Sequence, residues 1–347
     1  MSVILGIIFL VLVFNIKIHK DIYASYIDKR QTANINGIFV ILVFLSHFSQ
    51  YVELGGKWDI VFIVCKHMLG QLVVTTFLFY SGYGVMYSIM NKKDYINRML
   101  SERILKTLVL FDGAIIVYIL INLFLKNDMT MKQIMLAFIG WESVGNSTWY
   151  IFAILIMYLI TYLTFKILRN ASTFTKLLIT SLFICVYILV IREWKESQYY
   201  NTVMCYAMGL WYAYYKEKID MLVSDKKIYR LLFVLSGIGF AITIIFREAN
   251  LAINQAYYLM FVLWIVLISM KVEINSLILG WCGRNVFGIY IFQRLPMLVL
   301  IKNNWMASNV YVYLIICIVV TVILVKVYHW LAIKNIENYF IKSMKWR

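Results

Sequence analysis

Residues 34–52, NINGIFVILVFLSHFSQYV, form an apolar run that only a few polar side chains interrupt. A helix needs about 20 such residues to cross the hydrocarbon core of a bilayer, which is about 30 Å thick. Similar runs recur from one end of the chain to the other. The pattern therefore predicts a protein that crosses the membrane many times.

The composition supports this prediction and excludes other classes of protein. Of the 347 residues, 63% are apolar and 14% are charged, whereas soluble domains have about 45–50% and about 25%. A soluble chain of this size buries only about 75% of its surface, so it could not hide this much apolar area. Disordered, collagen-like, coiled-coil and disulfide-rich secreted proteins are excluded. The five cysteines stand singly and without metal-ligand spacing, so no metal site is expected.

About eleven runs reach the required length. They predict an all-α polytopic membrane protein with about ten or eleven transmembrane helices in one bundle. The third run is too long for one straight crossing, so its first residues are expected at the interface or the outer mouth. The first run lacks the positive start and cleavage site of a signal peptide and is interpreted as a helix. The predicted segments are residues 2–18, 35–52, 60–90, 105–125, 148–167, 176–192, 201–215, 231–247, 254–270, 286–302 and 309–331.

The basic residues determine the predicted orientation. The chain carries 33 Lys and Arg against 17 Asp and Glu, a net charge of +16. Most of these basic residues fall in alternate loops, which the positive-inside rule places in the cytoplasm. This interpretation is preferred to nucleic-acid binding, and it puts the N-terminus outside and the C-terminus in the cytoplasm.

No soluble domain or flexible linker separates the segments, so a single membrane-embedded domain is expected over residues 1–347. Residues 1–30 are expected to form an extra N-terminal helix and a cytoplasmic link. Residues 31–331 form the predicted core, and residues 332–347 form a basic cytoplasmic tail.

Polar side chains at membrane depth are costly unless they are paired or hydrated, so they indicate function. His47 follows Asn36 by eleven residues, about three helical turns, and the two side chains therefore share one face. A neutral imidazole, with an ordinary pKa of about 6.5, can accept a proton from a hydroxyl group. The alternative is a structural histidine bound to a neighbouring helix. His67 competes for the same role and is interpreted as structural or lining.

The segment FLFYSGY, Phe77–Tyr83, ends the third run. Ser81, Gly82 and Gly84 are small enough to let two helix backbones approach closely. The chain then enters NKKDYINRMLSERILK, residues 91–106, a basic amphipathic stretch at the predicted cytoplasmic surface.

Arg98 and Arg103 give this stretch a positive rim. Such a rim can hold the phosphates of a nucleotide-bearing donor or the head groups of anionic lipids. Charge alone favours the lipid interpretation. Asp112, inside the following run, is expected to pair with Arg103 or Lys106.

Two predicted outer loops combine aromatic and polar residues. One contains Glu142 shortly before Trp149, and the other is WKESQYY, Trp194–Tyr200. Side chains of this kind stack on sugar rings. Anchoring at the membrane interface explains the same residues and is the favoured interpretation.

Five motifs stand in the order that is typical of one family. They are NGIFVILVFLSHF at Asn36–Phe48, FLFYSGY, the paired Arg98 and Arg103, STWYIFAILIMYL with Trp149 and Tyr150, and GRNVFGIYIFQRLP at Gly283–Pro296. On these motifs the chain resembles the integral-membrane acyltransferase-3 family over roughly residues 30–331. That family O-acylates cell-envelope polysaccharides and other acceptors outside the cytoplasm, and its usual ten helices would be the second to the eleventh segments here.

The resemblance implies a multi-pass enzyme of the bacterial plasma membrane, an O-acetyltransferase that moves an acetyl group from cytoplasmic acetyl-CoA to a hydroxyl of a capsule, exopolysaccharide or other envelope polysaccharide. Acetyl-CoA would be the donor substrate, without a bound cofactor. The other expected partners are a polysaccharide or lipid-linked glycan acceptor and membrane lipids, and no nucleic acid. The resemblance makes His47 the expected catalytic residue. Donor binding is expected at Asn36, Ser81, Tyr83, Arg98 and Arg103, and acceptor contact or lining at His67, Glu142, Trp149, Gln293 and Arg294.

The chain departs from the family pattern at three positions. Asn36 stands where the family has Arg or Lys, Gln293 where a histidine often follows the last tyrosine, and Lys106 where a proline is usual. Arg294, beside Gln293, is expected to reach an internal acid, a carbonyl group or an anionic ligand. The departures keep a rival function open, a polysaccharide exporter or flippase of the same family without acyl-transfer chemistry. A sensor or scaffold is less attractive, because no soluble output domain is present.

Overall fold

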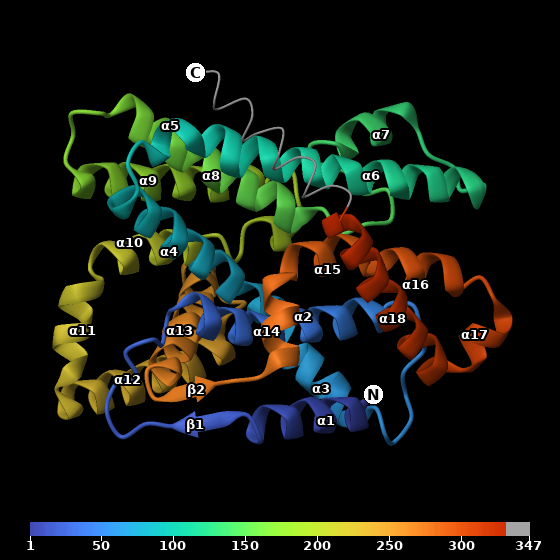
Figure 1. The fold of residues 1–347 in the computed structure, drawn as a ribbon, viewed down its shortest axis with the longest axis horizontal. Coiled ribbons are helices and arrows are strands. Elements are labelled where there is room, and N and C mark those ends of the chain that lie inside the picture. The colour runs from blue at the N-terminus through green and yellow to red at the C-terminus, as the bar shows by residue number, and fades with distance from the viewer. Residues whose placement is uncertain (331–347) are drawn as a thin grey trace. The chain divides into compact units, whose positions relative to one another are not determined.

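The computed structural model describes residues 1–330, and most of them are helical (Figure 1). The prediction of an all-α polytopic membrane protein is confirmed. The predicted tail, residues 332–347, lies outside the described residues. The longer helices are α1 Ser2–Val13, α2 Lys29–Phe48, α3 Ile60–Leu69, α4 Thr75–Asn91, α6 Lys106–Phe124, α8 Trp149–Ile167, α9 Thr173–Ile191, α10 Met204–Tyr214, α11 Lys216–Ser224, α12 Lys226–Phe246, α13 Leu251–Ser269, α14 Leu277–Arg284 and α18 Val310–Tyr328. The shorter ones are α5 Tyr95–Met99, α7 Met131–Ala137, α15 Val286–Phe292, α16 Arg294–Leu300 and α17 Asn304–Ser308, with the 3-10 turns η1 Gly70–Val74 and η3 Ser197–Tyr199 and the π-helical segment η2 Leu100–Leu105.

Two compact units make up the described chain. The first unit comprises residues 1–40, 55–95 and 167–284, and the second comprises residues 41–54, 96–166 and the described residues from 285 onward. Helix α2 passes from the first unit into the second after Val40. The single membrane-embedded domain expected from the sequence stays a prediction.

Within residues 1–330, eight helical segments are long and apolar enough to cross a membrane. They match eight of the predicted runs and are Lys29–Phe48, Ile60–Asn91, Tyr95–Phe124, Trp149–Ile167, Thr173–Ile191, Lys226–Phe246, Leu251–Ser269 and Val310–Tyr328. The other three predicted runs form shorter or interrupted helices, namely α1, α10 and the pair α15–α16. The predicted orientation, with the N-terminus outside and the C-terminus in the cytoplasm, stays a prediction.

The run predicted over residues 60–90 is interrupted at Gly70. This glycine has a φ of +42°, in the region that side chains with a Cβ rarely adopt. Helix α3 ends there, η1 follows, and α4 begins at Thr75. As expected from its length, this run is not one straight helix.

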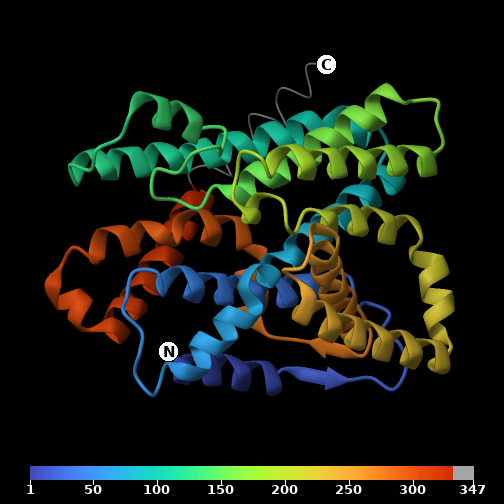
Figure 2. The same cartoon turned by 180° about the vertical axis from the view of Figure 1, so that it is seen from behind.

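The first predicted run also ends early. Helix α1 stops at Val13, and residues Ile16–Ile18 form strand β1, which pairs antiparallel with strand β2, Val272–Ile274. Figures 1 and 2 show the two arrows side by side from opposite directions. The sequence analysis missed this pairing because the partners lie more than 250 residues apart.

The acid in strand β2 ties the strand pair to α2. Glu273 lies 3.0 Å from His19 Nε2 and accepts a 2.6 Å hydrogen bond from Arg30. The contact with His19, followed by the charge of Arg30, holds the pKa of Glu273 below its ordinary value. The carboxylate is therefore ionised at neutral pH and secures the start of α2 within the first unit.

Glycines bring two pairs of helices in the first unit into close contact. A Cβ on Gly82 in α4 would lie 2.1 Å from the Tyr206 carbonyl oxygen in α10, and one on Gly209 in α10 would lie 2.0 Å from the Phe79 carbonyl oxygen. The expectation of close approach is thus confirmed for Gly82, whereas a Cβ on Gly84 would meet nothing within 4 Å.

The second close pair explains the glycine of the GRN motif. A Cβ on Gly283 in α14 would lie 1.7 Å from the Ala33 carbonyl oxygen in α2, and one on Gly37 would lie 2.0 Å from the Leu279 carbonyl oxygen. Each helix therefore needs a glycine opposite the backbone of the other.

Candidate functional site

The candidate site lies in the second unit, around the last turn of α2. His47 occupies that turn and is 9% exposed. Its Nδ1 lies 2.9 Å from Nε2 of Gln293, which is fully buried between α15 and α16. The two residues are 246 positions apart in the chain, so the fold brings together the predicted catalytic residue and one predicted lining residue.

The chain's one proline places Gln293 at a break in its helix. Pro296 lies in the first turn of α16, where a missing N–H is tolerated. In one continuous helix its ring would clash with the carbonyl of Phe292. Helix α15 therefore ends at Phe292, and the preceding carbonyl, that of Ile291, accepts a 3.0 Å hydrogen bond from the Tyr118 hydroxyl.

The amide of Gln293 is only partly satisfied. Its Nε2 also donates to the main-chain oxygen of Tyr290 at 3.3 Å. Its Oε1 is buried and has no hydrogen-bond partner among the described residues. A side-chain amide offers both a donor and an acceptor, so Gln293 can serve either protonation state of the His47 Nδ1.

A row of aromatic rings extends from the imidazole. The ring of Tyr290 lies 6.2 Å from that of His47, and the ring of Tyr150 lies 5.4 Å from that of Tyr290. Trp149, a predicted site residue at the start of α8, packs edge-to-face on Tyr150 at 6.0 Å. Trp149 is thereby connected to His47 through two tyrosines.

Arg294 supplies a positive charge next to Gln293. Its Nε donates to Ser147 Oγ at 2.8 Å, and its Nη2 donates to Gln50 Oε1 at 2.6 Å. Its guanidinium also lies 6.0 Å from the centre of the Tyr51 ring. The sequence analysis expected Arg294 to reach an acid, a carbonyl group or an anionic ligand. Among the described residues, Arg294 reaches the side-chain carbonyl of Gln50 and the hydroxyl of Ser147.

The loop before α8 positions Ser147. Asn122 in α6 donates to the main-chain oxygen of Val144 at 2.8 Å, and Gln133 in α7 donates to that of Ser143 at 2.7 Å. These bonds order the loop that also contains Glu142, whose side chain is half-buried. The acceptor role expected for Glu142 stays a prediction.

The two predicted phosphate-binding arginines lie on an unusual stretch of helix. Arg98 is the next-to-last residue of α5 and forms an i,i+4 ion pair with Glu102 at 3.2 Å, while Arg103 lies in the π-helical segment η2. An α-helix turns about 100° per residue, which would place residues five apart on different faces. A π-helix forms i→i+5 hydrogen bonds and so brings such residues one above the other.

Asp112 does not pair as expected. Among the described residues it forms no ion pair with Arg103 or Lys106, and its buried Oδ1 has no hydrogen-bond partner. The expectation relied on sequence distance, which assumed a regular α-helix. Arg103 lies inside the π-helical segment Leu100–Leu105, which changes the face that it occupies relative to Asp112.

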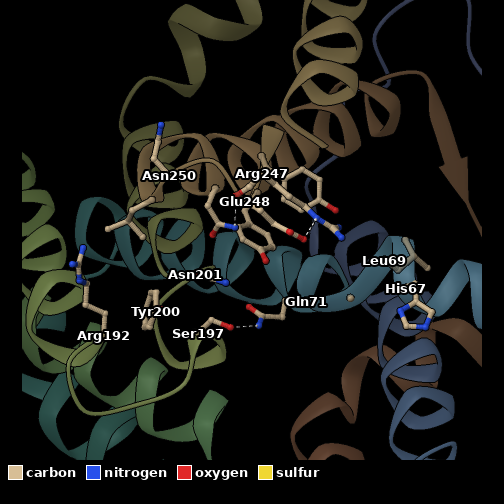
Figure 3. Close-up of a pocket in the computed structure, with 15 residues that line it drawn as sticks. His67, Leu69, Gln71, Arg192, Ser197, Tyr200, Asn201, Arg247, Glu248 and Asn250 are labelled. Atoms are coloured by element: carbon tan, nitrogen blue, oxygen red, sulfur yellow. Dashed lines mark hydrogen bonds and ion pairs between the residues drawn. The ribbon is translucent and has the colours of Figure 1, made fainter. Parts of the chain in front are cut away.

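Four predicted site residues belong to the first unit. Asn36 in α2 has a buried Oδ1 without a hydrogen-bond partner among the described residues. Ser81 and Tyr83 lie in α4, where the Tyr83 ring is 6.2 Å from that of Tyr87. His67 lies near the end of α3 and lines a pocket (Figure 3).

The sequence analysis missed Gln50, Ser147 and Tyr290 as members of the site. Gln50 follows His47 by three residues, and Tyr290 precedes Gln293 by three. That spacing is one helical turn and would have been a usable signal. Ser147 lies in a loop, where no periodicity could have pointed to it. Among residues 1–330 there is also no group of three or more His, Cys, Asp or Glu side chains that could hold a metal ion.

Comparison with known proteins identifies the family. The family model Acyl_transf_3, described as an acyltransferase domain, matches residues 34–331. Comparisons with curated proteins and with solved structures each gave no significant match. Because the matched range covers most of the chain and contains eight apolar helices of membrane-crossing length, this protein belongs to the acyltransferase-3 family and is a multi-pass membrane acyltransferase.

Proposed function

We propose that this acyltransferase transfers an acetyl group from cytoplasmic acetyl-CoA to a hydroxyl of an envelope polysaccharide, from a position in the bacterial plasma membrane. The observation that carries the proposal is the buried pair of His47 and Gln293, with Arg294 beside it. A buried imidazole held by an amide has the properties of a general base, and the matched family supplies the reaction class.

The proposed reaction needs one proton carrier. The acceptor hydroxyl oxygen forms a bond to the acyl carbonyl carbon, and the carbon–sulfur bond of the thioester breaks. His47 takes the hydroxyl proton and returns it to the departing CoA thiolate. Arg294 would stabilise the negative charge that develops on the carbonyl oxygen during the transfer.

Gln293 sets the nitrogen of His47 that can react. A base at Nε2 requires the hydrogen on Nδ1, and that hydrogen needs an acceptor. Rotation of the Gln293 amide by about 180° presents Oε1 to Nδ1, and in the present rotamer Nε2 donates to Nδ1 instead. With Oε1 turned toward Nδ1, the amide accepts the Nδ1 hydrogen both before and after Nε2 takes up a proton.

The donor is proposed to bind through the rim that contains Arg98 and Arg103. Arg103 lies in the π-helical segment Leu100–Leu105 and Arg98 lies two residues before it, and guanidinium groups suit the phosphate groups of CoA. Donor binding by Ser81, Tyr83 and Asn36, which belong to the first unit, stays a prediction from the sequence.

Replacement of His47 by alanine tests the proposal. The variant should lose transfer by about 10²–10⁴-fold, the usual contribution of a general base. The measurement is the transfer of labelled acetyl groups from acetyl-CoA to polysaccharide in membranes. The matched control is His329→Ala, the same exchange at an exposed histidine, which should leave transfer unchanged. Parental transfer by His47→Ala at equal membrane content would refute the role of His47.

Export of the polysaccharide is the second candidate, because Asn36 and Gln293 are both neutral where the family pattern has basic residues. Mass spectrometry of the polymer from a deletion strain separates the two functions. Loss of an acyl mass with a normal amount of surface polymer supports transfer. Loss of surface polymer with accumulation inside the cell supports export.

A further inference from the structure

A pocket of about 560 Å³ opens in the first unit, and its volume is typical of small-molecule sites. Three separate segments line it, residues 67–71, 192–201 and 247–258 (Figure 3). The break at Gly70 belongs to the first of these segments, so the glycine turn shapes one wall of the pocket. None of this wall takes part in the His47 site described above.

The pocket walls contain buried oxygens that lack partners. Gln71 donates through Nε2 to Ser197 Oγ at 3.4 Å, and Asn254 donates to the Arg247 main-chain oxygen at 3.2 Å. The amide oxygens of both residues are buried without a hydrogen-bond partner among the described residues. A buried acceptor of this kind usually has a partner, so two in one pocket point to a ligand that donates hydrogen bonds.

Aromatic rings complete the lining. Tyr257 is held rigidly, because its hydroxyl donates to the Met68 main-chain oxygen at 3.2 Å and its ring stacks on Phe240 at 5.4 Å. Tyr200 and Tyr258 also line the pocket. A flat aromatic wall beside unsatisfied amides suits a ring that is apolar on one face and carries hydroxyl groups at its edge.

Each of the two arginines that line the pocket forms an ion pair with the acid that follows it in the chain. Arg247 pairs with Glu248 at 3.7 Å and lies 5.8 Å from the centre of the Tyr257 ring. Arg192 pairs with Glu193 at 3.0 Å. Each arginine therefore has an adjacent acid, and this arrangement favours a neutral ligand over an anion.

The predicted orientation puts all three lining segments on the same side of the membrane. Residues 192–201 and 247–254 fall in loops that the positive-inside rule places outside, and residues 67–71 follow the outer start of the third run. That side is the one on which an envelope polysaccharide is found.

We propose that this pocket binds a neutral pyranose unit of the acceptor polysaccharide, with Gln71 and Asn254 accepting hydrogen bonds from sugar hydroxyls and Tyr200 packing on the ring. The proposal rests on the proposed function for the identity of the polymer, whereas the binding of the sugar follows from the pocket.

The test uses the full chain in lipid nanodiscs on a microarray of bacterial envelope oligosaccharides that contain neutral hexoses, N-acetylhexosamines or uronic acids. The wild-type protein should bind neutral glycans at low and at high salt. Gln71→Leu, which removes the amide but keeps the size of the side chain, should weaken this binding about tenfold. Gln198→Leu is the matched control. It is the same exchange within residues 192–201, at a side chain that does not line the pocket, and this variant should bind glycans as the wild-type protein does. Tyr200→Ala provides a second pocket variant.

Absence of glycan binding by the wild-type protein would overturn the proposal. Binding by Gln71→Leu and Tyr200→Ala that equals binding by the wild-type protein would also overturn it. Binding restricted to uronic acids and lost at high salt would also overturn it. His47→Ala should bind glycans normally. If His47→Ala keeps full transfer activity, the proposed function fails. Sugar binding by the pocket is then tested by the microarray alone.

Discussion

At the scale of single residues, the site depends on one imidazole and one amide. Gln293 stands where the family often has a histidine, and an amide can orient His47 but cannot itself take up a proton near neutral pH. In the proposed reaction, proton transfer therefore depends on His47 alone, with Gln293 as a positioning residue.

Substitution of Gln293 tests this assignment. Gln293→Leu removes the amide oxygen that can accept the Nδ1 hydrogen of the reactive tautomer, and it should lower the rate of acetyl transfer about tenfold or more. Gln293→His should keep transfer and add a second ionisation to the pH–rate profile. The measurement is the rate of transfer from pH 5 to 9 at equal membrane content. An unaltered profile in both variants would mean that Gln293 only fills space.

At the scale of helices, the two close contacts depend on glycines that face backbone atoms. Gly82 and Gly209 are reciprocal, since each would direct a Cβ at a carbonyl oxygen of the other helix. A backbone oxygen cannot rotate away as a side chain can, so helices α4 and α10 would have to move apart. The FLFYSGY motif therefore serves helix packing through its glycine.

Two glycine substitutions in α4 form a matched pair. Gly82→Ala should destabilise the protein by about 1–3 kcal/mol, as overpacking of a tight contact does, and should lower its thermal transition in detergent. Gly84→Ala, two residues further along the same helix, should have no such effect, because its Cβ would meet nothing within 4 Å. Equal transitions for the two variants would contradict the close contact.

At the scale of the whole molecule, the proposed chemistry requires a fixed orientation. The acetyl-CoA rim must face the cytoplasm and the glycan pocket must face outward. The charge distribution predicts both, because the loops with most basic residues alternate with loops that have few.

Cysteine labelling of intact cells tests the orientation. A membrane-impermeant thiol reagent should label Lys57→Cys, in the predicted outer loop before α3, and should not label Lys93→Cys until the cells are lysed. Both lysines are exposed, so access depends on the side of the membrane. The unsubstituted chain, with its five native cysteines, provides the background signal. Labelling in the reverse order would invert the predicted topology.

Consecutive residues were enough to establish the membrane class, eight of the apolar helices and His47 as the catalytic candidate. The reason is that hydropathy and helical spacing are properties of neighbouring residues. The partial exceptions are also local, since the break at Gln293 follows from Pro296 and the turn at Gly70 from a glycine that adopts positive φ.

The partners of the functional residues depended on the tertiary structure. Residues 47 and 293 meet across 246 positions, and strand β1 pairs with a segment near residue 273. The pocket likewise combines three segments that are far apart in the chain. No periodic pattern records which helices become neighbours, because that choice depends on the fit of side chains and backbones once all helices are packed.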